Sequence, residues 1–269
     1  MLQVRQVVKY FGGVKALDGV SFDVRAGECV ALIGPNGAGK STCFACIAGQ
    51  QRPGAGEVVW AGRRIDALTP AQRLERGVAR TFQVAQTFEA LTVLQNLQLA
   101  MTARRGLPAW NVLDRAALPA AMQLLARVGL QPMAHADVLG LPYGARKRLE
   151  LGIALAGLGA AKPPSPHQQS PTAPQPRLLL LDEPAAGLAG TERLELMELV
   201  KSLARDGVAV LYTEHNMDAV FGVADRVLVL IEGRIAAQGS PGEIAHDPEV
   251  RSRYLGHAFD AHRQGAGDA

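Results

Sequence analysis

The stretch "GPNGAGKST", residues 34–42, sets a lysine and two hydroxyl residues directly after a glycine-rich turn. The apolar run "CVALI" precedes this stretch, and "KSTCFACIAG" continues from it with a helical pattern. Strand, glycine turn and helix in this order are the context in which the pattern G-x-x-x-x-G-K-[ST] binds phosphate. The sequence therefore predicts an α/β fold that begins with a phosphate-binding loop.

Each residue type in this loop has a physical reason for its place. Gly34, Gly37 and Gly39 allow positive φ and let backbone N–H groups approach an anion. Lys40 adds a charge for the β- and γ-phosphates, and the Ser41 hydroxyl is a candidate ligand of Mg²⁺. A turn with a solvated lysine is the alternative, but the flanking strand and helix disfavour it. The candidate nucleotide-binding residues here are Gly34, Pro35, Asn36, Gly37, Ala38, Gly39, Lys40, Ser41 and Thr42.

A second stretch, "LLLLDEPAAGL" at residues 178–188, runs from a buried strand into the adjacent acids Asp182 and Glu183. Ligands of open α/β sheets bind beyond the carboxyl ends of the strands, so the acids and the phosphate loop should share one edge. There Asp182 would hold Mg²⁺ and Glu183 would orient, or accept a proton from, the attacking water. Gln83 and His215 follow two more apolar strands and would join that edge. The alternative is an acidic strand end in solvent.

Composition sets further bounds. With 269 residues and 48% apolar residues, the chain can form one large α/β domain. A net charge of +3 from dispersed Lys and Arg gives no case for nucleic-acid binding. We see no secretory segment and no apolar run near the roughly 18 to 20 residues that cross a bilayer, so we expect a cytosolic chain. Cys43 and Cys46 form a CxxC without a second ligand pair, which favours packing over a redox or metal site.

Alternating strand and helix patterns predict a mainly parallel sheet with helices on both faces. The short strands near the start and the hairpin pattern "GEVVWAGRRI" suggest an additional antiparallel β subdomain. Residues 84–158 carry helical periodicity and are expected to be an inserted helical subdomain within a single domain, 1–269. Residues 159–177 contain six prolines and are expected to form a flexible loop.

These motifs, in this order, resemble the nucleotide-binding subunit of an ABC transporter across residues 2–256. The resemblance identifies residues 34–42 as the Walker A loop. It implies that Phe11 stacks on the adenine ring, with Tyr10 as the weaker candidate. It also makes Gln83 the Q-loop residue, at the metal and the catalytic centre.

The same resemblance assigns the acid pair and the histidine. Residues 178–183 match the Walker B strand with the catalytic glutamate Glu183, and His215 matches the switch histidine that contacts the γ-phosphate. The implied cofactors are ATP and Mg²⁺. Two such subunits would meet head to tail, and each Walker A site would be closed by the signature of its partner.

Several stretches, among them "FGGVKALDGVSF", "DEPAAGL" and "DPEVRSRYLG", are similar to the branched-chain amino acid (Liv-type) uptake group. Urea and short-chain amide importers remain open as close relatives. The implied partners are transmembrane permease subunits, a second ATP-binding subunit (the same or a related chain), and indirectly a periplasmic or extracellular solute-binding protein. The implied place is the cytoplasmic side of the inner membrane, with no nucleic acid as a partner.

The signature region "LPYGARKRLE", residues 141–150, departs from the usual L-S-G-G-Q. Pro142 replaces the serine whose hydroxyl normally reaches the partner's γ-phosphate, and Ala145 replaces the glutamine. Gly144 and the start of its helix can still present N–H groups to an anion. We therefore expect this signature to weaken the site that it closes on the partner subunit.

Two more polar residues of the family are replaced here. Ala189 stands where the family usually has Asp or Asn, and Ile153 stands where it usually has Arg. Three functions thus stay open: an importer ATPase, a binding or regulatory subunit that hydrolyses ATP poorly, and a soluble ABC ATPase working on DNA or ribosomes. The last usually needs a second cassette or a long coiled coil, and the chain shows neither pattern. The sequence does not reveal the transported solute or the role of the proline-rich segment.

Overall fold

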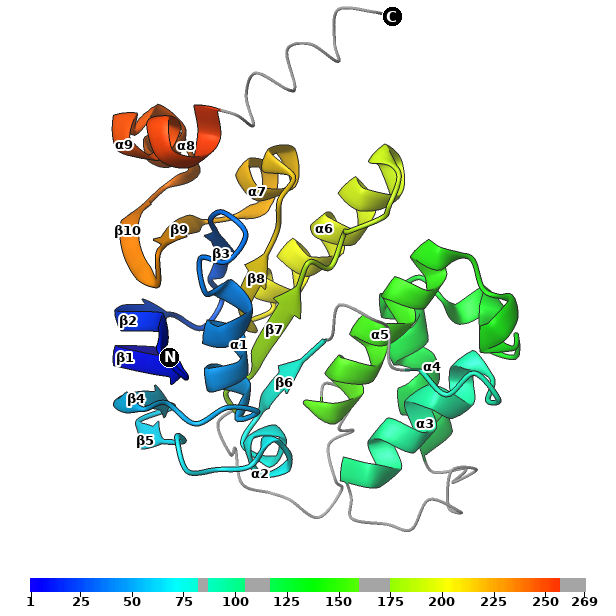
Figure 1. The fold of residues 1–269 in the computed structure, drawn as a ribbon. Coiled ribbons are helices and arrows are strands. Elements are labelled where there is room, and N and C mark those ends of the chain that lie inside the picture. The colour runs from blue at the N-terminus through cyan, green and yellow to red at the C-terminus, as the bar shows by residue number, and fades with distance from the viewer. Residues whose placement is uncertain (82–86, 105–116, 160–174, 257–269) are drawn as a thin grey trace, which may run out of the picture.

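The computed structural model describes residues 1–81, 87–104, 117–159 and 175–256, and Figure 1 shows their arrangement. The strands are β1 (Leu2–Phe11), β2 (Val14–Val24), β3 (Cys29–Ile33), β4 (Ala55–Trp60), β5 (Arg63–Arg64), β6 (Val78–Arg80), β7 (Leu178–Asp182), β8 (Ala209–Thr213), β9 (Arg226–Ile231) and β10 (Arg234–Gly239). The helices are α1 (Lys40–Ala48), α2 (Pro70–Glu75), α3 (Val93–Arg104), α4 (Leu118–Arg127), α5 (Tyr143–Gly157), α6 (Gly190–Arg205), α7 (Met217–Val223), α8 (Pro241–His246) and α9 (Pro248–Val250), with short turns at Gln131–Met133, Val138–Gly140 and Arg251–Leu255.

The main sheet has the strand order β10-β9-β3-β8-β7-β6. Neighbouring strands from β9 to β6 are parallel, and β10 is an antiparallel edge strand. All residues of β3, β7 and β8 are buried, as expected for central strands covered on both faces. The carboxyl ends of β3, β8, β7 and β6 therefore meet at one edge of this sheet.

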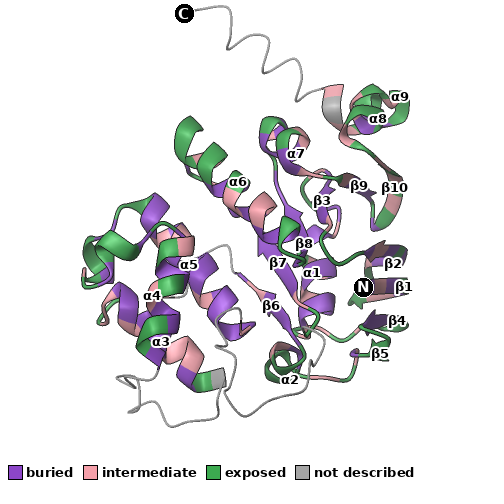
Figure 2. Ribbon diagram, turned by 180° about the vertical axis from the view of Figure 1, so that it is seen from behind, coloured by how far each residue is buried: buried purple, intermediate pink, exposed green. Residues whose placement is uncertain are grey.

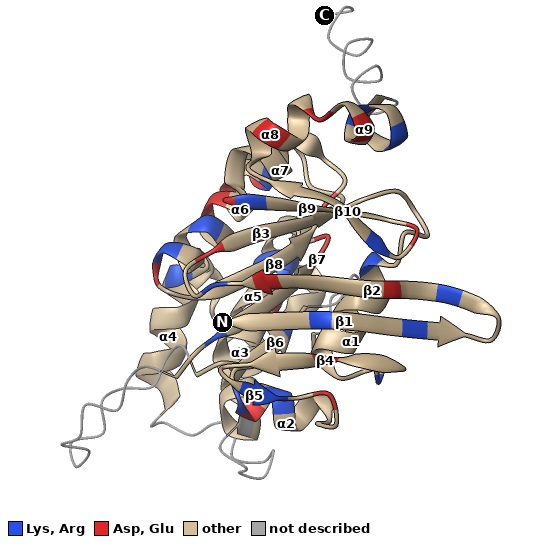
Figure 3. Ribbon diagram, turned by 90° about the vertical axis from the view of Figure 1, so that its left-hand side faces the viewer, with Lys and Arg blue, Asp and Glu red and all other residues tan. Residues whose placement is uncertain are grey.

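A smaller antiparallel sheet, β2-β1-β4-β5, packs over the first helix. Figure 3 looks onto this sheet, with β1 and β2 as a long ribbon in front of the main sheet. Alternate residues of β3 face opposite sides, so Val30 and Leu32 join one core and Ala31 and Ile33 the other. Helix α1 lies between the two sheets, which is why most of its residues are buried (Figure 2). The predicted fold class is confirmed.

Helices α3, α4 and α5 pack on one another beside the main sheet (Figure 1). Leu97, Leu125 and Leu149 are fully buried among them. These three helices lie where the sequence predicted helical periodicity. Residues 84–86 and 105–116 of the predicted subdomain and residues 160–174 of the predicted proline-rich loop lie outside the described residues. Within the described ranges, we find no helix with the length and apolar character needed to cross a membrane.

The short helices α2 and α8 were not predicted, although the sequence carries a signal for each. Thr69 and Gln72 form a capping box at the start of α2, and Ser240 and Glu243 form another at the start of α8. In each box a hydroxyl accepts the N3 backbone N–H while the N3 side chain accepts the N-cap N–H. Proline follows both caps, at the position where a helix tolerates it.

Arg73 of α2 is a fully buried cation that closes the far end of α1. Its guanidinium donates to the carbonyls of Cys46 and Ile47, at 2.6 and 2.5 Å, and to those of Leu68 and Asp66. These carbonyls of α1 have no partner within the helix, and a cation at a helix C-terminus is favoured by the helix dipole. Arg73 therefore fixes the helix that follows the phosphate loop.

Replacing Arg73 by Met should lower the free energy of unfolding by about 2–4 kcal/mol, because several buried carbonyls would lose their donor. Arg76→Met is the matched control, since Arg76 is exposed at the end of α2, and it should cost less than about 0.5 kcal/mol. Urea unfolding followed by circular dichroism measures both variants. Equal stability of the two variants would contradict the role given to Arg73.

Candidate nucleotide-binding site

The predicted phosphate loop connects β3 to α1. A Cβ on Gly34 would lie 2.0 Å from the Leu230 carbonyl oxygen, and one on Gly39 would lie 2.4 Å from that of Ala16. Both residues also have positive φ, 148° and 103°. Only glycine fits these two positions, so the tight turn of the loop depends on them.

Lys40, the first residue of α1, is 8% exposed and folds back into this loop. Its Nζ donates to the carbonyl oxygens of Gly34 and Pro35, at 2.6 and 2.9 Å. Burial lowers the pKa of Lys40, while the nearby carboxylates of Glu183 and Asp182 oppose that change. The ammonium group is therefore partly desolvated and bound only to neutral carbonyls in these two hydrogen bonds. An anion would form a stronger, charge-assisted bond with it.

The two acids of the second motif are held by one hydroxyl from the neighbouring strand. Asp182 ends β7 and is paired in register with Thr213, which ends β8. Thr213 Oγ1 donates to Asp182 Oδ1 at 2.8 Å and accepts from the Glu183 N–H at 3.0 Å. Glu183 has a φ of 49°, an uncommon conformation that this contact helps to hold. Thr213 was not predicted as a site residue, because its only signal in the sequence is its place at the end of an apolar strand.

His215 comes from the turn after β8 and reaches the second acid. Its Nε2 lies 2.8 Å from Glu183 Oε1, so the structure brings these two predicted catalytic residues together. Between Thr213 and His215, the buried carboxylate of Glu214 accepts the N–H groups of Ala185 and His215, at 2.9 and 3.3 Å. Burial raises the pKa of Glu214, partly offset by those N–H donors. Glu214, also missed, fixes the backbone on both sides of the Glu183–His215 pair.

The described residues offer hard oxygen donors for Mg²⁺. The Ser41 hydroxyl is exposed at the first turn of α1, and the Asp182 carboxylate lies at the end of β7. Among the described residues no cluster of three or more His, Cys, Asp or Glu could hold a metal by itself. Mg²⁺ usually binds one or two protein groups together with phosphates and water. Gln83, the remaining predicted metal and catalytic residue, lies outside the described residues.

Phe11 and Tyr10, the candidates for adenine stacking, end strand β1 and are 47% and 50% exposed. Lys9 Nζ lies 5.2 Å from the centre of the Phe11 ring, and Lys15 Nζ lies 5.6 Å from that of Tyr10. The β1–β2 hairpin also brings the Ala16 carbonyl against the phosphate loop at Gly39. An exposed aromatic face beside the loop is suitable for stacking on a base.

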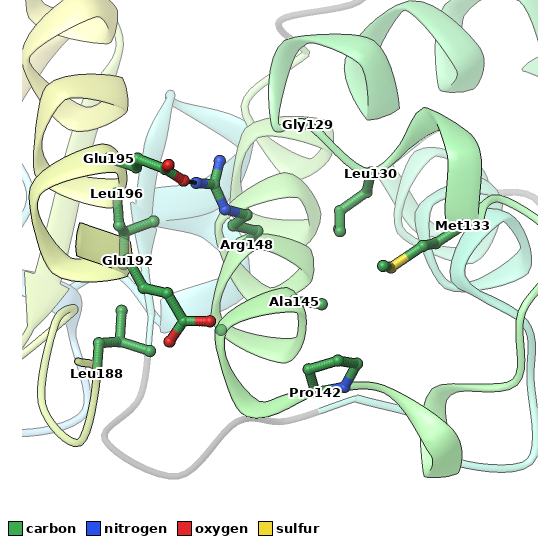
Figure 4. A pocket seen from close by; sticks show the side chains of 11 residues that line it. Gly129, Leu130, Met133, Pro142, Ala145, Arg148, Leu188, Glu192, Glu195 and Leu196 are labelled. Atoms are coloured by element: carbon green, nitrogen blue, oxygen red, sulfur yellow. Dashed lines mark hydrogen bonds and ion pairs between the residues drawn. The ribbon is translucent and has the colours of Figure 1, made fainter. Parts of the chain in front are cut away.

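The signature region lies in a different pocket, drawn in Figure 4. Pro142 is the N-cap of α5 and makes no side-chain cap bond, and Gly144 follows in its first turn. The Glu192 carboxylate from α6 lies where a side chain on Gly144 would be, with Oε1 3.0 Å from the position of a Cβ. Across the pocket, Arg148 Nη2 and Glu195 Oε2 form an ion pair of 2.7 Å. Of the predicted site residues that the structure describes, Gly144 alone lines this pocket.

The structure also locates the two other residues that differ from the family pattern and the two cysteines of the CxxC. Ala189 is the N-cap of α6 and makes no side-chain cap bond. Ile153 is half-buried and faces a groove beside α5. Cys43 and Cys46 are buried free thiols of α1, and burial raises the pKa of both. A thiol that stays protonated is a poor nucleophile and metal ligand, so packing explains this pair.

Comparisons with known proteins show the family of the chain. A family model described as "ABC transporter" matches residues 17–158. The high-affinity branched-chain amino acid transport ATP-binding protein LivG of Salmonella typhimurium is 36% identical over 268 residues, covering 96% of this chain and 98% of the relative. Its counterpart BraF of Pseudomonas aeruginosa is 34% identical with the same coverage.

Solved structures of ATP-binding cassettes are similar to this chain over nearly its whole length. A nucleotide-free ATP-binding cassette from an ABC transporter has a TM-score of 0.79 and 29% identity, covering 94% of this chain and 98% of that one. The ADP conformation of the ATP-binding cassette MJ1267 also has a TM-score of 0.79, with 30% identity and coverage of 95% and 98%.

Replacing Thr213 by Val should lower ATP hydrolysis roughly 10- to 100-fold, because the hydroxyl that holds both acids is lost without a change in shape. Affinity for ADP without metal should change less than about threefold, since the phosphate loop is untouched. Thr213→Ser keeps the hydroxyl and serves as the control. Hydrolysis by the Val variant at the level of the Ser variant would show that the hydroxyl is dispensable.

Proposed function

Because the chain belongs to the ABC transporter family of ATPases, we propose that it is the ATP-hydrolysing subunit of an importer for branched-chain amino acids or related small solutes. The observation that carries the hydrolytic role is the Glu183–His215 contact at the same sheet edge as Lys40 and Asp182. The solute class rests on the 36% and 34% identity to LivG and BraF over nearly the whole chain. Urea and short-chain amide importers are the alternative for the solute.

In the proposed mechanism each residue of the cluster has one task. Lys40 exchanges the carbonyls of Gly34 and Pro35 for the phosphate oxygens, which accept a stronger, charge-assisted bond. Glu183 orients the attacking water or accepts its proton, and His215 holds the Glu183 carboxylate and faces the γ-phosphate. Mg²⁺ held near Ser41 and Asp182 would neutralise charge that develops on the phosphates.

We propose that two such subunits close head to tail, either two copies or this chain with a related one. ATP bound in one subunit would contact the other only in the closed state, so it stabilises closure. Residues 34–42 and Phe11 would hold the nucleotide from one side, and Gly144 of the second subunit from the other. Gln83 would be a further ligand of Mg²⁺ and a member of the catalytic group.

A groove between α2, β6, α3 and α5 is the proposed contact with the permease. Its volume is about 770 Å³, and most of its lining is small or apolar. The lining residues are Ala48, Gln50, Pro70, Ala71, Leu74, Glu75, Val78, Ala79, Arg80, Ala100, Ala103, Ile153, Ala154 and Gly157. A groove of this kind accepts a short apolar helix from a partner. The chain would then work at the cytoplasmic side of the inner membrane, with the solute-binding protein reached only through the permease and no nucleic acid involved.

A second function, a subunit that binds ATP but hydrolyses it poorly in a mixed pair, is favoured by the signature. Pro142 offers no hydroxyl to a phosphate, and the Glu192 carboxylate next to Gly144 would repel one. This defect would act on the partner's site, whereas the Glu183–His215 contact and the buried Lys40 support a hydrolytic site in this chain itself. We therefore keep the hydrolytic role as the first proposal.

Replacing Glu183 by Gln separates the two functions. If this chain hydrolyses ATP, turnover by the purified transporter should fall roughly 100-fold in a pair of identical subunits and by about half or more in a mixed pair. ATP binding should be retained, because Lys40 and the phosphate loop are unchanged. Unchanged turnover with retained binding would instead assign the regulatory function.

Replacing Ala103 by Glu tests the groove. Ala103 is exposed and lines the groove, so the variant should fold normally while burying a charge against any partner there. Recovery of this chain with its co-expressed permease should fall at least about tenfold. The control is Ala126→Glu, an exposed alanine of α4 outside the groove. Equal recovery of both variants would place the permease contact elsewhere.

A further inference from the structure

Arg80 is a cation at the carboxyl edge of the main sheet that the proposed mechanism does not use. It ends β6, which runs parallel to β7, and its Nη2 donates to Asp182 Oδ2 at 2.7 Å. The side chains of Arg80 and Asp182 are only 12% and 11% exposed. A charge pair this well shielded from water interacts far more strongly than a surface pair.

Arg80 is fixed from two further directions by the helix that follows the phosphate loop. Its Nη1 donates to Gln50 Oε1, just beyond the end of α1. Its guanidinium carbon lies 5.8 Å from the centre of the Phe44 ring, three residues after Ser41. A planar guanidinium held at several points keeps one orientation, so the charge stays on the carboxylate.

The two oxygens of Asp182 are thus both engaged, one by Arg80 and one by Thr213. The negative charge of Asp182 is largely compensated before a metal ion arrives. Without such a cation, a bare carboxylate at this position would repel the phosphates of a nucleotide that carries no Mg²⁺. With Arg80 next to it, Asp182 attracts a divalent cation less strongly, because the positive charge of Arg80 offsets part of the negative charge of the carboxylate.

We propose that Arg80 is a positioning residue that sets how strongly nucleotide binding depends on Mg²⁺; this inference rests on the proposed Mg²⁺ site at Asp182. Arg80 supports binding of metal-free nucleotide and moderates the gain from Mg²⁺. The ratio of the Kd for ADP without Mg²⁺ to the Kd with Mg²⁺ measures this coupling directly.

The position of Arg80 also joins two parts of the molecule. Arg80 and Gln50 line the proposed permease groove, while the same guanidinium holds the Asp182 carboxylate. A partner that contacts Arg80 in the groove would therefore act on a residue one hydrogen bond away from the proposed metal ligand, and a partner that contacts Gln50 on a residue two hydrogen bonds away.

The test uses the purified full chain, a fluorescent ADP analogue, and titrations in excess EDTA and in excess Mg²⁺. Arg80→Gln should weaken binding in EDTA and raise the Kd ratio about tenfold over wild type, as expected for loss of one shielded charge. Arg80→Lys keeps a cation and should restore most of the wild-type ratio. Arg76→Gln removes the same charge four residues away and should leave the ratio unchanged.

A double-mutant cycle distinguishes an effect of Arg80 on the charge of Asp182 from a purely structural role of Arg80. In an Asp182→Asn background, Arg80→Gln should not change the ratio, because the carboxylate on which Arg80 acts is gone. If wild type binds ADP equally with and without Mg²⁺, the proposed metal site fails. If wild type depends on Mg²⁺ and Arg80→Gln keeps the same ratio while thermal unfolding shows a folded protein, the role of Arg80 is overturned.

Discussion

The site depends on the parallel pairing of β7 with β8, which sets Asp182 opposite Thr213. That register brings one hydroxyl between the two acids, and the turn after β8 then carries His215 onto Glu183. Side chains alternate along a strand, so a slip of one residue would send Asp182 and Thr213 to opposite faces. The full burial of both strands holds the register, because a slip would move polar groups into the core.

The phosphate loop holds its charged group, the Lys40 ammonium, in a position shielded from water, which costs free energy. Lys40 is desolvated, which lowers its pKa, and its partners are neutral carbonyls. The surrounding structure supports this by fixing α1 at both ends, through the tight glycine turn before it and Arg73 after it. The charge of a bound anion would compensate for the lost hydration of the Lys40 ammonium, so this burial contributes to the affinity for nucleotide.

Much of this organisation could be predicted from the sequence because it is local. The phosphate loop, the acid pair and the β4–β5 hairpin are encoded in continuous segments, and the capping boxes of α2 and α8 are local signals of the same kind. Thr213, Glu214 and Arg80 were missed for a different reason. Their roles arise from contacts between strands distant in sequence, and one sequence does not specify which residues become opposite one another.

The proposed chemistry requires that Lys40, Asp182, Glu183 and His215 surround one triphosphate. A crystal structure of the full chain with Mg²⁺ and a non-hydrolysable ATP analogue would show this arrangement. We expect Lys40 Nζ on phosphate oxygens, the metal near Ser41 and Asp182, and the Glu183–His215 pair facing the γ-phosphate. An analogue bound elsewhere, or a γ-phosphate facing away from Glu183, would contradict it.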